Sequence, residues 1–196
     1  ENRKNAKLRV EIFREVDLIF LCLPESASKE TMKLINLNSN ISAVVIDSSS
    51  FHRVDPSWVY GFPELKKGQK KLIINSKRIA NPGCYASAAI SIIRPLVEGG
   101  VLQSTSPLVI HAVSGYTGGG KEMIKHFTQP DSEPFIHYGL SMNHKHLKEI
   151  VSYGLLKKIP IFCPSVGAFP QGMTVSIPIH FEWCRKNISG EKIRSV

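Results

Sequence analysis

Hydrophobic residues in the first half of the chain gather in short runs, separated by stretches in which they recur at helical spacing. Residues 16–23 and 43–46 are near-continuous apolar runs, which is typical of strands buried on both faces of a parallel sheet. Helical spacing marks residues 26–37, and residues 7–16 have the pattern of the end of a helix. Strand, helix and strand in this order predict a parallel α/β sheet.

The rest of the chain is predicted to contain one more short strand, a long helix and then several strands. A loop-rich stretch, 51–65, precedes a strand at 79–80, and helical spacing then runs from 85 to 97 before two glycines end it. Strands are expected at 108–113, 159–163 and 173–181, an extended segment at 135–142, and a helix at 145–156. We therefore expect an α/β protein with two domains: residues 1–83 with a parallel sheet, and residues 84–196 with a mixed sheet.

Composition argues against several classes of partner. The net charge is +9, but the lysines are scattered as pairs without interleaved aromatic residues. We therefore interpret the charge as a solvated basic surface and predict no nucleic-acid partner. The longest apolar run, 18–23, is far shorter than the roughly 20 residues of a membrane span. Because no signal peptide is visible either, a cytoplasmic protein without membrane contact is predicted.

Cysteine usage agrees with that setting. The chain has four cysteines, and none of them forms a C-x-x-C pair. This spacing argues against a zinc knuckle or a redox dithiol and favours reduced thiols. Cys22 and Cys163 lie in apolar strand patterns, so they are expected to be small buried side chains.

Cys84 differs from the other cysteines because it follows Asn81, Pro82 and Gly83 directly and opens a predicted helix. Backbone N–H groups and the helix dipole favour an anion at that position, so a thiolate would be stabilised there. A thiolate at a helix start can act as a nucleophile toward a carbonyl group. From this motif alone, a buried cysteine without a chemical role is equally compatible.

Two histidines are the next candidate for chemistry. Glu149 follows His146 by three residues, so on a helix its carboxylate can orient one imidazole nitrogen. A solvated basic turn is the competing interpretation of the segment from His144 to His146. No metal site is predicted, because residues two apart do not share a helix face and no third ligand is obvious.

A glycine-rich stretch, 114–121, fits the front of the G-x-x-x-x-G-K pattern. The next residue is Glu122, and the missing Ser or Thr hydroxyl argues against a P-loop NTPase. Its backbone N–H groups can still hold an anion, although a flexible loop tip is equally compatible. Cysteine with histidine is also typical of thiol proteases, but the buried parallel strands favour a nucleotide-binding half and redox chemistry.

Several motifs, taken in order, resemble those of one enzyme family. They are residues 51–53 (Phe-His-Arg), 58–64 (Trp-Val-Tyr-Gly-Phe-Pro-Glu), 81–86 (Asn-Pro-Gly-Cys-Tyr-Ala), 111–121 and 144–146 (His-Lys-His). Together they closely resemble the N-acetyl-gamma-glutamyl-phosphate reductases of the shorter, second type, which are relatives of aspartate-semialdehyde dehydrogenase. The resemblance extends from residue 16 to about residue 181.

The resemblance implies an enzyme of arginine biosynthesis. Residues 1–83 would be part of an NADP-binding Rossmann domain, and residues 84–196 a catalytic, substrate-binding and oligomerisation domain of a homo-oligomer. The implied reaction is reductive dephosphorylation of N-acetyl-L-glutamyl 5-phosphate to N-acetyl-L-glutamate 5-semialdehyde through a cysteine thioester. Phosphate is released and NADPH is consumed.

The resemblance also implies roles for particular residues. Cys84 matches the nucleophile, and His146 is our choice for the acid–base group with Glu149 as its orienting partner, while His144 is the other candidate. Substrate or phosphate binding is expected at Ser114, Gly115, Lys121 and His144. Cofactor binding is expected at Pro24, Ser48, Ser49 and Ser50, which follow the two predicted parallel strands.

Two parts of the family pattern are not found in the sequence. No opening strand and glycine-rich turn precede residue 16, and no C-terminal segment returns to complete the cofactor domain. We therefore interpret the chain as a fragment and predict that alone it binds NADPH poorly and turns over slowly. Two alternatives stay open, a cofactor-independent thiol hydrolase that uses Cys84 and His146, and a non-catalytic remnant of the reductase.

Overall fold

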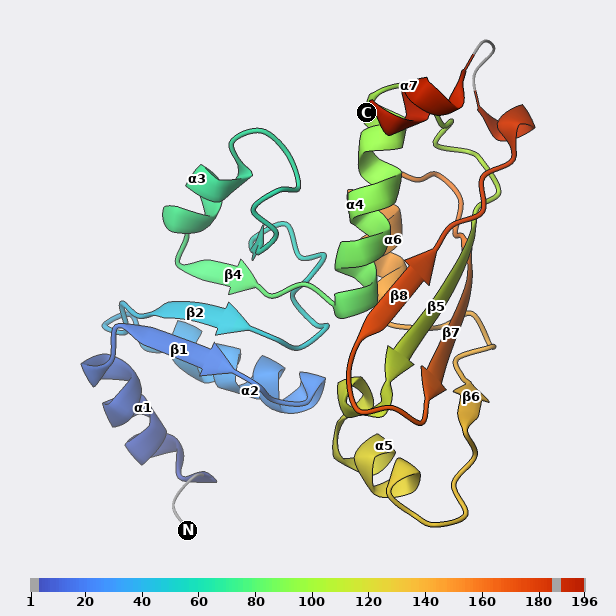
Figure 1. Ribbon diagram of the computed structural model, residues 1–196. Coiled ribbons are helices and arrows are strands. Elements are labelled where there is room, and N and C mark those ends of the chain that lie inside the picture. Colours follow the sequence, from blue (N-terminus) through green and yellow to red (C-terminus); the bar gives the residue numbers. More distant parts are fainter. Residues whose placement is uncertain (1–3, 185–187, 196) are drawn as a thin grey trace. The chain divides into compact units, whose positions relative to one another are not determined.

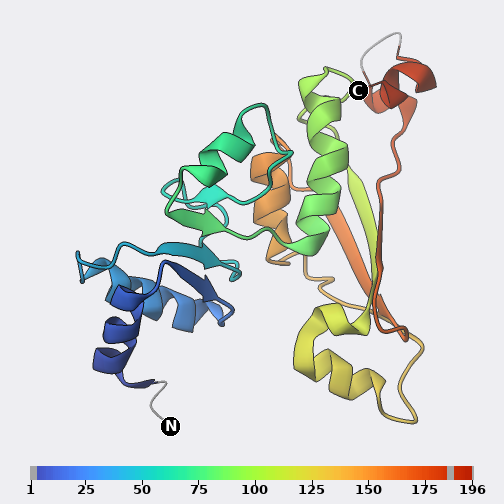
Figure 2. The same cartoon turned by 60° about the vertical axis from the view of Figure 1, so that its left-hand side comes forward.

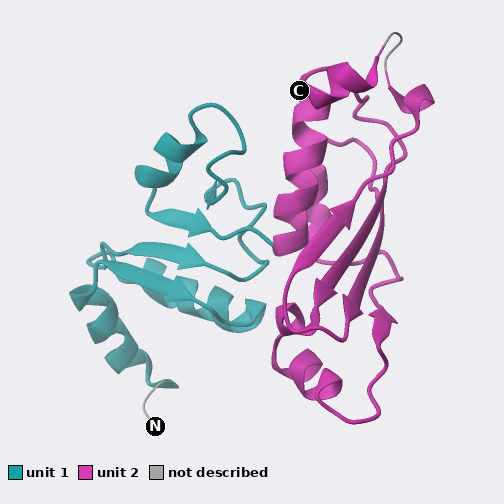
Figure 3. Ribbon diagram, in the orientation of Figure 1, with its two compact units in different colours: residues 1–83 teal, residues 84–196 magenta. Residues whose placement is uncertain are grey.

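The chain forms two compact units, Glu1–Gly83 and Cys84–Val196, in a computed structural model (Figure 3). The structure describes residues 4–184 and 188–195. Each unit has its own four-stranded sheet, with the strand orders β1-β2-β4-β3 and β6-β7-β5-β8.

Unit 1 (residues 1–83) carries a parallel sheet. Its elements are α1 (Ala6–Glu15), β1 (Leu18–Leu21), α2 (Glu25–Asn36), β2 (Val44–Asp47), β3 (Val59–Tyr60), α3 (Gln69–Ile74) and β4 (Arg78–Ala80). All three strand pairings are parallel, and the register aligns Leu21 with Asp47 and Asp47 with Ala80. The residues that follow β1 and β2, among them Pro24 and Ser48–Ser50, therefore lie at the same end of the sheet.

Helices α1 and α2 pack on the same face of this sheet (Figure 1). Asn5 begins α1 by accepting hydrogen bonds from the backbone of Lys7 and Leu8, which satisfies N–H groups that lack helical partners. The core beneath the two helices is the following buried set: Val10, Ile19, Leu21, Met32, Ile35, Ile41, Ala43, Val45, Trp58 and Ala80. Its members come from every predicted strand of this half. The predicted burial on both faces is wrong for β1, because Leu18 and Phe20 on its other face are 44% and 63% exposed.

Unit 2 (residues 84–196) carries a mixed sheet. Its elements are α4 (Cys84–Glu98), β5 (Val109–Gly115), the 3₁₀ turn η2 (Tyr116–Gly119), α5 (Gly120–Phe127), β6 (Phe135–His137), α6 (His146–Tyr153), β7 (Ile161–Gly167), β8 (Met173–Ser176), η3 (Phe181–Trp183) and α7 (Gly190–Arg194). Strand β7 runs parallel to β5 and antiparallel to β6, and β8 runs antiparallel to β5.

Helices α4 and α6 lie side by side on one face of the mixed sheet (Figures 1 and 2). The strand side chains toward them are buried, for example Ile110, Ala112 and Phe162. On the alternate positions, which form the outer face of the sheet, His111 is exposed and Ile161 keeps 54% of its surface accessible. Unit 2 thus presents one packed face and one open sheet face.

These observations confirm the predicted α/β fold with one parallel and one mixed sheet, and they correct several details. Helix α1 is a complete ten-residue helix with its own cap, not the end of a longer one. The prediction missed α3, α5 and β3, since these elements are short. Helices α3 and α5 lie in stretches rich in lysine or glycine, and the two residues of β3 lie between Pro56 and Pro63. The predicted strand at 173–181 is wrong beyond Ser176, and the extended segment at 135–142 holds only the short strand β6.

The expected burial of two cysteines is also corrected. Cys22 is exposed and Cys163 is partly exposed, because Cys22 lies just beyond the end of β1 and Cys163 lies on the outer face of β7. Neither is paired, and the structure describes all four cysteines as free thiols. Among the described residues, no helix has both the length and the apolar character needed to cross a bilayer.

Candidate active site

Cys84 is the first residue of α4, and it is exposed. The helix is held in place by its buried face, which consists of Tyr85, Ala86, Ala89, Ile90, Ile93 and Leu96. This spacing leaves the first residue free to face outward while the second points into the unit. The structure therefore places the predicted nucleophile at a helix N-terminus where a reactant can reach it.

A cluster of aromatic and imidazole rings lies beside the start of α4. Tyr85 contacts His146 edge-on, with 5.9 Å between ring centroids, and His144 at 6.2 Å. His144 in turn lies 4.7 Å from His146 and 5.0 Å from Phe162. The structure thus brings both predicted histidines to the helix turn that carries the cysteine.

His144 is an uncharged imidazole at neutral pH. Burial, and secondly the charge of Lys145, lower its pKa from 6.5 to about 4. Its Nδ1 accepts a hydrogen bond of 3.2 Å from the backbone N–H of His146. Because Nδ1 accepts, the single ring proton lies on Nε2, so His144 presents a hydrogen-bond donor.

His146 and Glu149 both lie in the first turn of α6, with 5% and 1% of their surfaces exposed. His146 is more deeply buried than His144, which is half-buried. Buried carboxylate and imidazole groups one helical turn apart agree with the predicted spacing.

The glycine-rich stretch is not one loop. Ser114 and Gly115 end strand β5, and Lys121 lies exposed in the first turn of α5. Residue 115 must be a glycine, because a Cβ at this position would lie only 2.6 Å from the backbone nitrogen of Gln171. Gly120 has φ +78°, a conformation that favours glycine. The strand end and the turn therefore hold Ser114 in a fixed place, while Lys121 projects from a separate helix.

The four residues predicted for the cofactor lie in unit 1, at the carboxyl ends of β1 and β2. Pro24 is the N-cap residue of α2, and Ser48–Ser50 follow β2 directly. The hydroxyl of Ser50 donates to the carboxylate of Glu25, in the first turn of α2. These contacts join the two strand ends, as expected from the parallel order.

A buried carboxylate anchors the segment after β2, and the sequence prediction missed it. Asp47 is fully buried and accepts hydrogen bonds from the Ser49 backbone N–H (2.9 Å), the Ser49 hydroxyl (2.7 Å) and His52 Nδ1 (2.5 Å). Burial would raise the pKa of Asp47, but the bonds from Ser49 and His52 outweigh it and hold this pKa below its usual value. The His52 ring stacks on Trp58, with centroids 4.0 Å apart. The sequence signal that could have identified this network is an Asp that ends a buried strand and is followed by serines.

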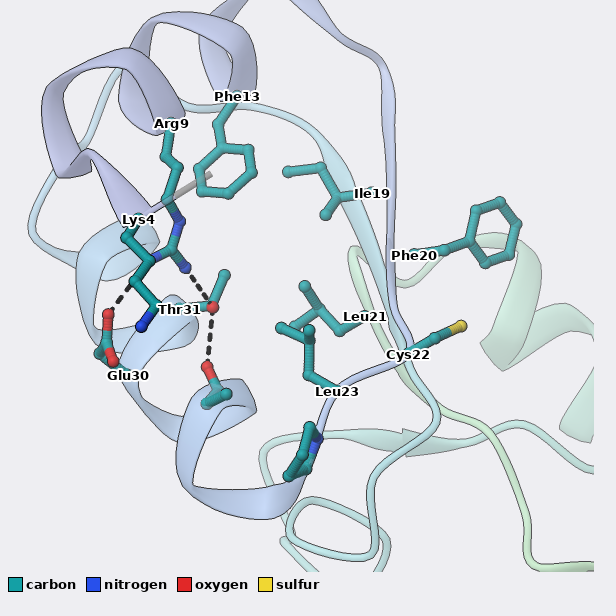
Figure 4. A pocket seen from close by; sticks show the side chains of 12 residues that line it. Lys4, Arg9, Phe13, Ile19, Phe20, Leu21, Cys22, Leu23, Glu30 and Thr31 are labelled. Atoms are coloured by element: carbon teal, nitrogen blue, oxygen red, sulfur yellow. Dashed lines mark hydrogen bonds and ion pairs between the residues drawn. The ribbon is translucent and has the colours of Figure 1, made fainter. Parts of the chain in front are cut away.

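A cavity of about 1040 Å³ lies along β1, between α1 and α2 (Figure 4). Ile19, Phe20 and Leu21 are among the residues that line it, and the side chain of Phe20 points away from those of Ile19 and Leu21 (Figure 4). At its rim, Arg9 donates hydrogen bonds to Glu30 and Thr31. Among the described strands, β1 pairs only with β2, so it forms one edge of the sheet of unit 1.

A metal centre has no support from these residues. Within 4–184 and 188–195, no group of three or more His, Cys, Asp or Glu side chains is arranged to hold an ion. His144 and His146 contact each other through their ring edges and share no such group.

The neutral state of His144 gives a direct prediction. In a ¹H–¹⁵N long-range correlation spectrum, His144 should show the Nε2–H neutral tautomer from pH 8 down to about pH 5, because its pKa is about 4. His126 is the control, since its exposed ring contacts Glu133 instead of a buried cluster. A protonated His144 at pH 6 would contradict this assignment.

Comparison with known proteins relates both units of the chain to semialdehyde dehydrogenases. Residues 84–196 match the family model described as semialdehyde dehydrogenase, dimerisation domain, and residues 1–73 match that described as semialdehyde dehydrogenase, NAD binding domain. The N-acetyl-gamma-glutamyl-phosphate reductase of Rhizobium rhizogenes is 43% identical over 98% of this chain, which spans 63% of that relative's length. This similarity confirms the resemblance inferred from the motifs.

Solved structures show the same fold. Aspartate semialdehyde dehydrogenase II from Vibrio cholerae matches with a TM-score of 0.70 at 15% identity, covering 93% of this chain and 60% of that one. Aspartate semialdehyde dehydrogenase with NADP from Candida albicans matches with a TM-score of 0.58 at 14% identity, covering 92% of this chain and 55% of that one. Fold, motifs and both domain matches agree, and the chain belongs to the semialdehyde dehydrogenase family.

Proposed function

We propose that this chain carries the catalytic part of an NADP-dependent reductase that converts N-acetyl-L-glutamyl 5-phosphate to N-acetyl-L-glutamate 5-semialdehyde in arginine biosynthesis. The observation that carries the proposal is the exposed Cys84 at the start of α4, beside the cluster that holds His144 and His146. The similarity to N-acetyl-gamma-glutamyl-phosphate reductases supports the choice of substrate. In this proposal unit 1 binds the cofactor and unit 2 binds the substrate.

The first chemical step belongs to unit 2. The Sγ of Cys84, as thiolate, attacks the acyl carbon of the substrate, and the bond from that carbon to the phosphate oxygen breaks. Phosphate leaves with the bonding electron pair, and a thioester joins the acyl group to Cys84. No oxidation occurs in this step, so it needs no cofactor.

The histidines have different roles in the proposal. His144 donates from Nε2 to an oxygen of the acyl phosphate, since its Nδ1 already accepts from the backbone. His146 is the acid–base group, with Glu149 as its orienting partner in the same helical turn. Ser114 and Lys121 bind the anionic groups of the substrate, through a hydroxyl and a positive charge. Gly115 belongs to the same strand end, where its backbone N–H already donates to the carbonyl oxygen of Gly172 (2.9 Å).

The residues after β1 and β2 fit part of a nicotinamide dinucleotide. Ser48 offers a hydroxyl group for a ribose or amide group, next to Pro24. The hydroxyl protons of Ser49 and Ser50 are donated to Asp47 and Glu25, so these two residues hold the segment in place. Glu25 lies in the first turn of α2 and its negative charge disfavours a pyrophosphate there. When bound, the cofactor supplies a hydride. The match to an NAD-binding domain supports a nicotinamide dinucleotide, and the proposal takes NADP as its form.

Phosphate release tests this function. Without cofactor, N-acetylglutamyl phosphate should release about one phosphate per chain above the blank rate and leave an acyl adduct on Cys84. Release stops there because the next step is the reduction of the thioester, and no hydride donor is present. Addition of NADPH should consume the adduct slowly and yield the semialdehyde, because the chain alone is predicted to bind NADPH poorly. Continuous phosphate release without NADPH and without an adduct would instead identify a thiol hydrolase, and no release at all would support a non-catalytic remnant.

We further propose that unit 2 forms a homo-oligomer through the outer face of its sheet. This face carries Phe135, His137, Ile161 and Cys163 at alternate strand positions, and α4 and α6 cover the opposite face. The match of residues 84–196 to a dimerisation domain supports a second copy of the chain as the occupant. Burying apolar side chains such as Ile161, now 54% exposed, favours association.

Substitution of Ile161 by glutamate should shift the chain from dimer to monomer. Because a charge at the centre of an apolar interface loses water without gaining a partner, the dimer dissociation constant should rise roughly tenfold or more. Light scattering over a dilution series measures this change. Ile159→Glu is the matched control, since Ile159 is 66% exposed and lies before β7. Equal behaviour of the two variants, or a monomeric parent chain, rules out this interface.

A further inference from the structure

Most of the excess positive charge of the chain lies in one exposed segment of unit 1. Residues 65–83 contain no acidic residue and six basic ones, namely Lys66, Lys67, Lys70, Lys71, Lys77 and Arg78. All five lysines are exposed, and the whole chain has a net charge of +9. Two lysine pairs that seemed scattered in the sequence thus belong to α3 and to the turn directly before it.

Helix α3 is fixed so that its lysines face away from the sheet. Gln69 is 3% exposed, and its Nε2 donates a hydrogen bond of 2.6 Å to the carbonyl oxygen of Tyr60. Because consecutive side chains of a helix are about 100° apart, Lys70, Lys71 and Ile74 lie on the side opposite to Gln69. Ile74 is 71% exposed and lies one helical turn from both lysines. The outer face of α3 therefore combines positive charge with an exposed apolar side chain.

The lysines are not neutralised by the chain itself. Among the described residues, no ion pair involves any of the five lysines. Glu64 directly precedes the segment, and within the same described residues it is exposed and makes no ion pair either. Like charges that are neighbours on a helix and an adjoining turn repel each other. A partner with negative charge would remove this repulsion and could cover Ile74 at the same time.

The side chains around the lysines favour one kind of anionic partner. Single-stranded nucleic acids are bound with the help of aromatic side chains, and residues 65–83 contain none. Membrane binding by a helix depends on the apolar area that it inserts, and the six-residue α3 exposes two large apolar side chains, Leu72 and Ile74. A peptide segment with carboxylates beside apolar side chains is complementary to both the lysines and Ile74.

We propose that residues 66–74 form a docking surface, here called the α3 surface, for an acidic amphipathic segment of another protein. Carboxylates of that segment pair with the lysines, and an apolar side chain of it packs on Ile74. None of the residues 66–74 belongs to the proposed catalytic or cofactor site. The inference therefore goes beyond the proposed reductase activity and is tested without it.

Binding of a synthetic peptide tests the α3 surface. The probe is a fluorescent helical peptide with leucines along one face and glutamates on both sides of them, and fluorescence anisotropy measures its affinity for the chain. The double variant Lys70→Gln, Lys71→Gln should weaken binding roughly threefold to tenfold, since exposed ion pairs contribute little individually. Ile74→Ser should weaken binding roughly fivefold, because an apolar contact is lost while every charge remains.

A second lysine pair supplies the matched control. Lys157 and Lys158 are exposed and precede Ile159, which is 66% exposed, but they lie outside the α3 surface. The double variant Lys157→Gln, Lys158→Gln should therefore keep the affinity within about twofold of the parent chain. Urea unfolding should show no loss of stability for Lys70→Gln, Lys71→Gln, because repulsion between lysines is reduced. This separates a lost docking surface from a damaged helix.

Several results overturn the proposal. Equal weakening by the two double variants would mean that net charge alone attracts the peptide. Unchanged affinity of Ile74→Ser would remove the apolar part of the surface, and a parent chain that does not bind the peptide would remove the surface altogether. Tighter binding of duplex DNA or of phosphatidylserine vesicles than of the peptide would identify a nucleic-acid or a membrane surface instead.

Discussion

Cys84→Ser should lower the rate of acylation by N-acetylglutamyl phosphate by roughly 10⁴-fold or more, as expected when the sole nucleophile is removed. The attacking species is the thiolate, and a serine hydroxyl in the same place is protonated and far less nucleophilic. Cys84 is the first residue of α4 and is exposed, so the substitution changes one atom without disturbing the buried face of the helix. Intact-mass spectrometry and phosphate release measure the effect.

Cys22→Ser is the matched control for this experiment. Cys22 is also an exposed free thiol, but it lies after β1 in the other unit. It should acylate at the parent rate. Acylation that persists in Cys84→Ser and disappears in Cys22→Ser would refute the assignment of the nucleophile.

Asp47→Asn should destabilise the chain by about 3 kcal/mol, the size expected when buried hydrogen-bond donors lose a charged acceptor. Asp47 is 0% exposed and accepts three hydrogen bonds, two from Ser49 and one from His52. An asparagine has one acceptor oxygen and an NH₂ group, so a donor would face a donor in a fully buried site. Urea unfolding at pH 7 measures the loss.

Asp55→Asn is the control, because Asp55 makes the same local contacts, to the backbone and hydroxyl of Ser57, in a more exposed position. We expect it to cost less than about 1 kcal/mol, as a hydrogen bond near water does. Equal losses for the two variants would show that the buried network of Asp47 has no special stabilising role.

The pH dependence of the Asp47 effect has a definite sign. The pKa of Asp47 is lowered in the folded chain, so its contribution is present above the unfolded value of about 3.9 and is lost as pH falls through the folded pKa. The stability difference between the parent and Asp47→Asn should therefore be constant from pH 5 to 8 and shrink below about pH 4.

The architecture could be predicted from local patterns, and the errors occur where local patterns are weak. Near-continuous apolar runs predicted β1 and β2, and helical spacing predicted α2, α4 and α6. A helix that buries one face repeats its apolar residues with the period of the helix, so the spacing is visible in the sequence. Helices α3 and α5 were missed, since six and eight residues carry too few apolar positions to show a period. Cys22 and Cys163 were expected to be buried, but the ends and outer faces of strands depend on what covers them.

The linear order of residues was sufficient for the family, since Asn81–Cys84 and the two histidines are recognisable as motifs, and it named Cys84 as the candidate nucleophile. Only the folded chain showed that Asp47 bonds to His52 and that Tyr85 reaches Ser114 and Ser165. These partners are five, 29 and 80 positions apart in sequence. Their contacts and the lowered pKa of His144 arise from packing between elements, because burial and hydrogen bonding depend on neighbours that a sequence pattern does not identify.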